Sequence, residues 1–373
     1  MENEIEMNRP TWVEVDLEAI KNNFLRIQEK VSSKSVICVV KADAYGLGAS
    51  KIASTLEEVG ASAFAVASME EALSLRDSQI KKPILVLGYV DTRNLHLASL
   101  NEIRITLFDK DFLKRINDYK NETPLKIHVK IDTGMHRLGI SLTELPSVFE
   151  ELNKIKNVIV EGIYTHFASA DSDPEYTRFQ INQFNEAIKY LKDKNMLPKI
   201  VHAANSAALL NFEEAHYSAV RPGILLYGIS PNPQTLQLGT DFREALAIKT
   251  RIVKVTQYGK GERISYGGTY KTEKESLIAT IPIGYADCVP RNLSNRGYVL
   301  VKGLKAPIVG NITMDMMMID VTGFPYIHPG NEVVIVGSQG QNRITLEEFA
   351  SLSKTIPYEI LTRLNKRIKR IYK

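Results

Sequence analysis

The sequence predicts an α/β plus β fold: an N-terminal (β/α)8 barrel of the TIM type followed by a mostly β C-terminal domain. Two observations carry this prediction. In the first part of the chain, short runs of β-branched residues alternate with amphipathic, helix-like stretches, as in consecutive βα units. Beyond about Ser230 the pattern changes to strands separated by turns, with little helical periodicity until Thr345. The two patterns indicate two domains of different class.

Eight apolar runs in the first part are candidate strands. They end at Val40, Ala67, Gly88, Phe108, Ile131, His166, Ala204 and near Arg221. Helical patterns between them cover, among others, 49–59, 69–77 and 174–192. Eight strand–helix units in succession are the pattern of a closed barrel, whose active site lies at the C-terminal ends of its strands. A doubly wound open sheet is the alternative.

The second part contains five strand-like runs separated by turn residues. They lie within 245–258, 276–285, 297–303, 316–321 and 331–337. We therefore expect a barrel domain at 12–235 and a β domain at 236–373, with the segment 1–11 as a candidate addition to the β domain.

Charge and composition argue against a polyanionic partner. The net charge of +4 is small and is spread along the chain, whereas nucleic-acid binding proteins gather basic residues into a patch. The basic segment 363–373 is interpreted as a solvated helix end that runs into a short strand, because no aromatic platform accompanies it.

Cysteine usage and the N-terminus favour a cytoplasmic protein. Cys38 and Cys288 lie far apart and lack metal-ligand spacing, so we expect neither a disulfide framework nor a metal site. Residues 1–10 lack the features of a signal peptide, and no apolar run approaches membrane-spanning length. We expect no membrane association.

Polar groups collect at the expected C-terminal ends of the strands. Lys41 follows the first strand, in VVKADAYGLG; a lysine there is usually a solvated surface residue, but its neighbours favour a reactive one. Later strand ends carry Lys130, Arg137, His166, Asn205, Ser206 and Arg221. Ser206 follows the seventh strand, and Gly223 with Ile224 follows the eighth, where barrels commonly bind phosphate through backbone N–H groups.

A family resemblance joins these features. VVKADAYGLG, VKIDTGMHRLG, YTHFASAD, HAANSAALL, VRPGILLYG, ISYGGTY, PIGYAD, NITMDMMMID and IPYEILT together resemble the alanine racemases, in the family's order and from about residue 12 to the end of the chain. The resemblance implies a barrel followed by a β domain, pyridoxal 5'-phosphate as cofactor, and interconversion of L- and D-alanine. It also implies a role in supplying D-alanine for peptidoglycan.

The resemblance assigns two catalytic bases. Lys41 would be the Schiff-base lysine and one base, and Tyr266 the other. Racemisation removes a proton from one face of Cα and returns one to the opposite face, so two opposed bases are the simplest design. A tyrosine base needs positive neighbours that stabilise phenolate, for which His166 and Arg221 are candidates. Taken alone, Tyr266 would be interpreted as a buried ring in a β-hairpin.

Further roles follow from the resemblance. Arg221 would face the pyridine nitrogen and leave it unprotonated. Arg137 would contact the cofactor's phenolic oxygen and the substrate carboxylate, and Lys130 would be carbamylated to orient Arg137. The remaining cofactor-binding set is Tyr45, His166, Asn205, Ser206, Gly223, Ile224 and Tyr358.

The resemblance also implies a homodimer with shared sites. Met314, as a substrate contact, and Asp315, as a supporting residue, would reach the site from the other subunit, as Tyr266 would. The run 316–318 is interpreted instead as the apolar core of a strand.

The chain departs from the family pattern beside the cofactor and at the substrate entrance. Asp43 and Leu47 replace asparagine and histidine, Asn311 and Thr313 replace arginine and a cysteine or serine, and Cys288 and Val289 replace glycine and tyrosine. With Tyr285, Arg291 and Asn311 at the expected entrance, serine racemisation or a broader amino-acid specificity stays an alternative.

Two other classes share parts of this architecture. The decarboxylases of basic amino acids combine a barrel with a β domain but carry different glycine-rich and cysteine motifs. A pyridoxal-phosphate carrier or homeostasis protein is a lone barrel, and it needs neither a second domain nor an opposing base such as Tyr266.

Overall fold

The computed structural model describes residues 9–119, 123–232 and 241–373. Contacts divide the chain into two compact units: Ala19–Arg243, and the described residues up to Glu18 together with Glu244–Lys373. The boundary expected near residue 235 falls outside the described residues, so the limits 12–235 and 236–373 stay a prediction.

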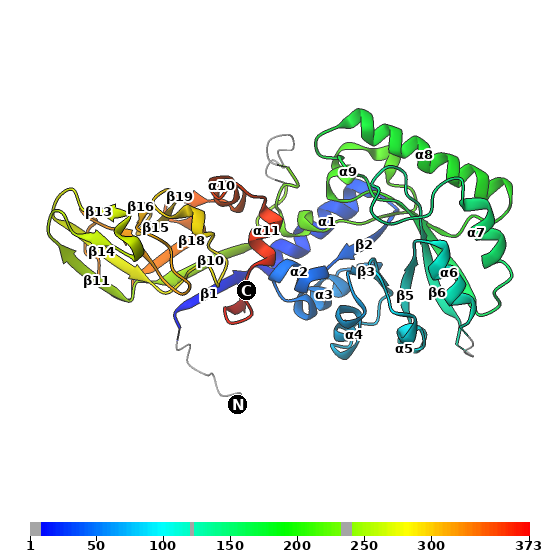
Figure 1. Ribbon diagram of the computed structural model, residues 1–373, viewed down its shortest axis with the longest axis horizontal. Coiled ribbons are helices and arrows are strands. Elements are labelled where there is room, and N and C mark those ends of the chain that lie inside the picture. The colour runs from blue at the N-terminus through cyan, green and yellow to red at the C-terminus, as the bar shows by residue number, and fades with distance from the viewer. Residues whose placement is uncertain (1–8, 120–122, 233–240) are drawn as a thin grey trace. The chain divides into compact units, whose positions relative to one another are not determined.

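The first unit is a closed barrel of eight parallel strands, as predicted (Figure 1). The last strand pairs with the first, with Ala219 opposite Ser35, which rules out the open sheet. The strands are β2 (Ser35–Val39), β3 (Ala63–Val66), β4 (Ile84–Val86), β5 (Ile103–Leu107), β6 (Leu125–Lys130), β7 (Val158–Tyr164), β8 (Ile200–His202) and β9 (Ala219–Val220).

Helix α1 precedes the first barrel strand, the other helices follow barrel strands, and all lie outside the barrel (Figure 1). They are α1 (Leu17–Val31), α3 (Ala49–Glu58), α4 (Met69–Asp77), α5 (Leu95–Leu100), α6 (Lys110–Asn117), α7 (Leu145–Leu152), α8 (Pro174–Asp193) and α9 (Ser206–Asn211), with the short turns α2 (Lys41–Gly46), η1 (Thr92–Asn94), η2 (Glu213–Ala215) and η3 (Ile224–Tyr227). Helix α8 shows why they form. Asp173 caps its first turn by accepting from the Tyr176 N–H at 3.0 Å, Pro174 occupies the first turn, and Thr177, Ile181 and Phe184 are buried at helical spacing.

Small and branched apolar side chains fill the part of the barrel nearest its first strand. Ile37, Val39, Ala65, Leu85 and Ala219 form one buried cluster. Because branched side chains of different strands interdigitate there, the barrel is a packed core and not a pore. This rigidity holds the strand ends in place.

The second unit is mostly β. Its principal sheet runs in the order β11-β14-β17-β16-β15-β18-β10-β1-β20, with β19 paired to β18 and a separate β12-β13 hairpin. The elements are β1 (Thr11–Val15), β10 (Leu246–Arg251), β11 (Lys254–Tyr258), β12 (Arg263–Ile264), η4 (Tyr266–Gly268), β13 (Tyr270–Lys271), β14 (Ser276–Ile281), η5 (Arg291–Leu293), β15 (Tyr298–Val301), β16 (Leu304–Val309), β17 (Met317–Asp320), β18 (Glu332–Gln339), β19 (Asn342–Ile344), α10 (Leu346–Leu352), α11 (Pro357–Thr362) and β20 (Lys369–Tyr372).

Strand β1 belongs to this sheet although it precedes the barrel in the chain. It pairs with β10 on one side and with the C-terminal strand β20 on the other. The basic segment 363–373 begins at the end of α11 and contains the paired strand β20, so the predicted short strand is present. Its pairing with β1 joins residues more than three hundred positions apart, which local patterns do not reveal.

The burial of single side chains tests the predicted apolar core at 316–318. Met317 is fully buried in β17, as expected for a core strand, but Met316 is 46% exposed, so the core interpretation is wrong for that residue. Cys38 and Cys288 are buried and free. Among the described residues, no helix is both long and apolar enough to cross a membrane.

Candidate active site

Lys41 stands at the C-terminal end of β2 and begins an unusual turn. The next four residues, 42–45, all adopt left-handed backbone conformations, with φ between 51° and 57°. None of them is glycine, and each such residue costs roughly 1–2 kcal/mol. Glu71 offsets this cost, because its carboxylate accepts from the N–H groups of Ala42 at 2.6 Å and Ala67 at 2.7 Å. Such strain is typical of functional sites.

The amine of Lys41 has a lowered pKa. Desolvation is the largest cause, followed by the positive charge of Arg137, with a smaller contribution from Arg221; Glu71 acts in the opposite direction. A lysine of lowered pKa carries more of the neutral, nucleophilic form near neutral pH. The expected position at the first strand end is confirmed, and its surroundings favour reactivity.

Tyr45, Ser206 and Gly223 form a cradle at the same end of the barrel. The Ser206 hydroxyl accepts from the Gly223 N–H at 2.9 Å. A Cβ on Gly223 would lie 2.2 Å from the Tyr45 hydroxyl oxygen, so only glycine fits there. Ser206 begins α9, which is capped by Asn205 through the Ala208 N–H at 2.9 Å. Asn205 is thus held by the helix end beside the cradle.

Arg221 is buried just beyond β9. Its guanidinium donates to His202 Nδ1 at 2.9 Å, to the carbonyls of Thr165 at 2.8 Å and Ala203 at 2.9 Å, and to His166 Nδ1 at 3.2 Å. Burial lowers the pKa of Arg221 to about 10, which still leaves it a cation at neutral pH. These contacts fix the orientation of a positive charge at the barrel end.

Two more groups at this end have shifted pKa values. Burial, then Arg137 and Arg221, lower the pKa of Lys130 to about 8, with Asp132 opposing. Burial, and then Arg221 and Lys130, hold the pKa of His166 well below its ordinary value. Lys130 therefore has an appreciable neutral fraction near pH 8, and His166 is neutral.

In the second unit, Tyr266 sits at the tip of the β12-β13 hairpin. Its side chain is 75% exposed, so the interpretation of a buried ring is wrong, although the hairpin itself is present. Asn311 holds this tip. Its side-chain amide donates to the Tyr266 backbone carbonyl at 2.7 Å, and its own backbone carbonyl accepts from the Ser265 hydroxyl at 2.6 Å. Asn311 and Tyr266 are thus brought together.

The loop that carries Tyr285 is locked to the turn that carries Met314. The N–H of Tyr285 donates to the Thr313 carbonyl at 3.1 Å, and that of Ala286 to the Met314 carbonyl at 3.0 Å. A Cβ on Gly284 would lie 2.2 Å from the Thr313 carbonyl oxygen, so this close approach needs glycine. Tyr285 and Met314 are 43% and 53% exposed.

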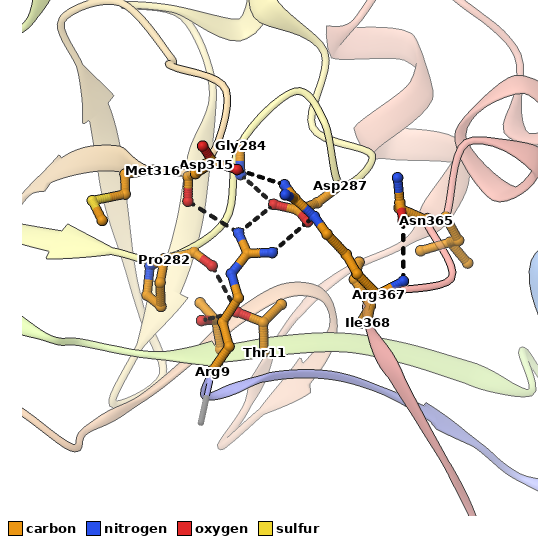
Figure 2. A network of polar contacts seen from close by, with 12 residues as sticks. Arg9, Thr11, Pro282, Gly284, Asp287, Asp315, Met316, Asn365, Arg367 and Ile368 are labelled. Atoms are coloured by element: carbon orange, nitrogen blue, oxygen red, sulfur yellow. Dashed lines mark hydrogen bonds and ion pairs between the residues drawn. The ribbon is translucent and has the colours of Figure 1, made fainter. Parts of the chain in front are cut away.

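Asp287 is the centre of a polar network beneath this loop (Figure 2). Its fully buried carboxylate accepts two bonds from Arg9, at 2.7 and 2.6 Å, and one from Arg367 at 2.8 Å. Arg367 also pairs with Asp315 at 2.8 Å, and Arg9 donates to the Asp315 carbonyl at 3.1 Å. The network therefore supports Asp315 and the neighbouring Met314.

Of the remaining predicted residues, Arg137, which is exposed, and Ile224, which is buried at the start of η3, lie in the first unit, and two others lie in the second unit. Arg291 is exposed and begins η5, and Tyr358 is half-buried in α11. The roles of Arg291 at an entrance and of Tyr358 toward phosphate stay predictions.

Comparisons with known proteins agree with the geometry along the whole chain. The model of the alanine racemase N-terminal domain matches residues 15–231, and that of the C-terminal domain matches residues 245–372. The chain belongs to the alanine racemase family. The family's members are isomerases, as the resemblance implied.

Individual relatives cover the full length. An alanine racemase of Carboxydothermus hydrogenoformans is 42% identical over 98% of this chain and 100% of its own. A crystal structure of alanine racemase from Bacillus anthracis with bound L-Ala-P is 40% identical, with a TM-score of 0.92 over 98% of this chain and 95% of that one. A histidine racemase from Leuconostoc mesenteroides is 30% identical, with a TM-score of 0.90 over 98% of both chains.

The barrel end fits the cofactor that an alanine racemase is expected to use. A phosphate needs hydroxyl and backbone donors where the main chain comes close, which the cradle of Tyr45, Ser206 and Gly223 offers. An aldehyde needs a neutral amine, which the lowered pKa of Lys41 favours. A ring nitrogen needs a fixed partner, and Arg221 is held by four acceptors.

Three groups of this alanine racemase fold were not identified from sequence. Glu71 holds the lysine turn, Asp287 holds the Met314 loop, and His202 contacts Arg221. Glu71 looks like an ordinary acidic residue in the first turn of a helix. The only sequence signal for His202 is a histidine within an apolar strand. Asp287 lies within the PIGYAD motif but gives no sign of its two arginine partners.

Proposed function

We propose that the protein interconverts L-alanine and D-alanine with pyridoxal 5'-phosphate, using Lys41 and Tyr266 as opposed bases. The observation that carries the proposal is that a lysine of lowered pKa shares one barrel end with a buried arginine and a glycine cradle. This combination suits a phosphorylated aldehyde with an aromatic nitrogen. Its physiological role would be to supply D-alanine for peptidoglycan, in the cytoplasm.

When bound, the cofactor draws electrons from the substrate's Cα and so acidifies the Cα–H bond. Lys41 would hold the cofactor through its aldehyde carbon, and its amine would take or return the Cα proton on one face. Arg221 would donate to the ring nitrogen and, as a cation, leave it unprotonated. That arrangement moderates the electron withdrawal and disfavours transamination.

Tyr266 would act on the opposite face of Cα. A phenol of ordinary pKa is a weak base at neutral pH, so a nearby cation must stabilise the phenolate. Of the two candidates, His166 has a pKa held well below its ordinary value and is neutral, whereas Arg221 stays charged. We therefore assign the stabilising charge to Arg221, with His166 as a neutral hydrogen-bonding partner of it.

Arg137 would bind the substrate carboxylate and the cofactor's phenolic oxygen. Unmodified Lys130 would repel it, because both side chains are cations; after burial, the charge of Arg137 is the largest cause of the lowered pKa of Lys130. Carbamylation of the neutral Lys130 amine would replace this repulsion by an attraction that orients Arg137. We propose that modification.

We propose a homodimer with shared sites. Tyr266 and Met314 are large side chains that are 75% and 53% exposed on the second unit, and both are held in place, by Asn311 and by the Gly284 loop. Rigidly supported, exposed apolar side chains are typical of interfaces. A second copy would cover them and would receive Tyr266 as its opposing base.

Substrate range is the finer question. Asn311, where many family members carry arginine, supports the Tyr266 tip through its side-chain amide. A neighbour of the same fold is named for racemising histidine, so the architecture is compatible with other side chains. Serine or a broader amino-acid specificity is therefore the second candidate.

Incubation of the purified protein with L- or D-alanine in D2O tests the proposal. We expect deuterium at Cα together with loss of optical rotation from either enantiomer. Parallel reactions with serine and histidine determine the range. Release of CO2 would indicate a decarboxylase instead of a racemase. Absence of Cα exchange while the cofactor is bound would indicate a pyridoxal-phosphate carrier.

A further inference from the structure

A line of polar side chains crosses the barrel core behind Arg221. Arg221 Nη1 lies 2.9 Å from His202 Nδ1, and His202 Nε2 lies 2.8 Å from His128 Nδ1. His128 Nε2 lies 3.5 Å from a Glu161 carboxylate oxygen. Glu161 in turn forms a bidentate pair with Arg104, at 2.8 and 3.1 Å. Both histidine rings are buried.

The chemistry of arginine decides the protonation of this line. A guanidinium only donates, so His202 Nδ1 must be an acceptor and the single proton of its neutral ring lies on Nε2. His202 then donates to His128 Nδ1, which places the proton of His128 on Nε2 as well. That nitrogen lies 3.5 Å from the Glu161 carboxylate, the nearest negative charge to it on the line. Burial, above all, and the charge of Arg221 hold the pKa of His202 well below its ordinary value, consistent with a neutral ring.

The backbone is shaped to admit this line. Between β6 and β7, Ile127 is opposite Val160 but His128 is opposite Gly162, so Glu161 is the extra residue of a β-bulge. A Cβ on Gly162 would lie 2.6 Å from His128 Nδ1. Bulges commonly redirect a side chain. Here the bulge and the glycine together make room for His128 and set Glu161 against it.

The other groups around the line leave Glu161 as its negative end. The acceptors of Arg221 in the described chain are neutral: two histidines and two carbonyls. Tyr164 stacks on His202 at 4.8 Å, with Arg221 and Lys130 over its ring, and burial raises its pKa to about 12, so it stays neutral. Glu161 is ionised: burial alone would raise its pKa, but His128 and Arg104 lower it to about 2.

We propose that His202, His128 and Glu161 are positioning residues for Arg221, forming a polarised hydrogen-bonded chain in which both histidines are neutral with the proton on Nε2. The chain links the buried guanidinium to a carboxylate on the far side of the barrel core. It keeps Arg221 aimed and cationic without placing a carboxylate beside it. The orientation of Arg221 toward the ring nitrogen of the cofactor rests on the proposed function. The protonation pattern of the two histidines is independent of it.

The protonation pattern is tested directly by 15N nuclear magnetic resonance of the full-length protein labelled on histidine. A 15N–15N correlation across the shared hydrogen bond identifies His128 and His202. We expect both rings to be neutral with the proton on Nε2 from pH 8 to pH 6. A proton on Nδ1 of either ring, or an imidazolium signal in this range, would overturn the chain whatever reaction the protein catalyses.

The positioning role is tested by His202→Phe, which keeps an aromatic ring against Tyr164 but removes the acceptor for Arg221. We expect kcat to fall about 10- to 100-fold, the range for such supporting contacts, with KM changed much less and cofactor still bound. His216→Phe is the matched control, because His216 is also buried but its ring, within the described residues, bonds only to the nearby Leu209 carbonyl, at 2.9 Å.

Glu161, at the other end of the hydrogen-bonded line from Arg221, allows a second pair of variants. Glu161→Gln removes the charge and should lower kcat, whereas Glu161→Asp keeps the carboxylate and should restore part of it. A kcat for His202→Phe equal to that of His216→Phe, or equal kcat values for both Glu161 variants, would overturn the positioning role. If the unmodified protein racemises no amino acid, the proposed function is wrong. The resonance experiment still tests the protonation of His128 and His202.

Discussion

At the scale of single residues, the barrel end combines cations that differ in how firmly they hold their protons. Arg221 remains charged, with a pKa of about 10, whereas the pKa of Lys130 is about 8 and that of Lys41 is also lowered. Burial is the largest cause in each case. Arg221 is therefore a permanent cation, whereas both lysines lose their protons more readily than ordinary lysines do.

Lys41 and Tyr266 should fail in different ways when substituted. Lys41→Ala removes the amine that would hold the cofactor, so the absorbance of the bound cofactor and all activity should be lost. Tyr266→Phe keeps that amine and loses only the second base, so cofactor should remain and proton exchange at Cα should fall mainly for L-alanine. Racemisation itself should fall equally in both directions, because the two enantiomers have the same free energy. Absorption spectra and rates from each enantiomer measure both effects. Full activity in either variant would contradict the two-base assignment.

Lys130 should become carbamylated as pH rises, because CO2 reacts with the neutral amine and the pKa of Lys130 is about 8. With 13C-labelled bicarbonate, a carbamate resonance should grow between pH 6.5 and 8.5. Lys130→Arg should abolish it. Lys126→Arg is the control: Lys126 lies on the same strand but pairs with Glu102 at 3.6 Å. A resonance that survives in Lys130→Arg would exclude this site.

Residue roles were predictable where position alone decides them. Lys41, Ser206 and Arg221 follow strands, and the closed barrel brings strand ends together. His128 and His202 were not predictable, since they meet across alternate strands, 74 residues apart. That contact depends on the bulge at Glu161, which apolar periodicity does not encode.

At the scale of elements, the eight barrel strands and the helices at 49–58, 69–77 and 174–193 agree with the alternation of apolar runs. The left-handed turn at 42–45 could not be predicted, because four residues that normally avoid this conformation adopt it together. Its support comes from Glu71, about thirty residues away along the chain.

The cradle between the end of β9 and the lysine turn should not tolerate a methyl group. Gly223→Ala would place Cβ 2.2 Å from the Tyr45 hydroxyl, and the Tyr45 ring is packed edge-on against Tyr227 at 5.4 Å. We expect a loss of about 1–3 kcal/mol in the free energy of unfolding, as for other overpacked sites, and weaker cofactor binding. Thermal unfolding and cofactor titration measure these effects.

A second substitution separates the two effects of Gly223→Ala. Adding Tyr45→Phe removes the clashing hydroxyl, so stability should recover while cofactor affinity stays low. Gly259→Ala is the control, since a Cβ there meets nothing within 4 Å. Unchanged cofactor affinity in Gly223→Ala would show that the cradle does not bind the phosphate.

At the scale of the whole molecule, Asp287 ties both ends of the described chain to one loop of the second unit, through Arg9 and Arg367 (Figure 2). Burial alone would raise the pKa of Asp287, but bonds from Arg9, Arg367 and the Gly284 N–H outweigh it and leave the pKa lowered. A carboxyl whose folded pKa is lowered stabilises the protein above its unfolded pKa, and this stabilisation is lost as pH falls through the folded value.

Asp287→Asn should therefore destabilise the protein most at neutral pH, by about 3 kcal/mol or more for a buried pair that loses its anion. The difference between the variant and the unmodified protein should narrow as pH falls from 5 toward 3. Urea unfolding across this range measures it. Asp111→Asn, at an exposed pair with Lys114, is the control and should cost little. A difference that is independent of pH would contradict the role of the charge.

Sharing of sites between subunits can be decided with mixed dimers. A dimer of one Lys41→Ala chain and one Tyr266→Phe chain, purified through two different tags, contains one complete site if Tyr266 acts on the partner's barrel, and should show roughly half the activity of the unmodified dimer. If Tyr266 acted on its own barrel, both sites would be defective and the mixed dimer would be inactive.

The matched control pairs an unmodified chain with a chain carrying both substitutions. Shared sites leave that dimer inactive, because each site then lacks one base, whereas separate sites leave it about half active. The two dimers contain the same four side chains at the two positions, so opposite activities in them depend only on how the chains contribute to each site.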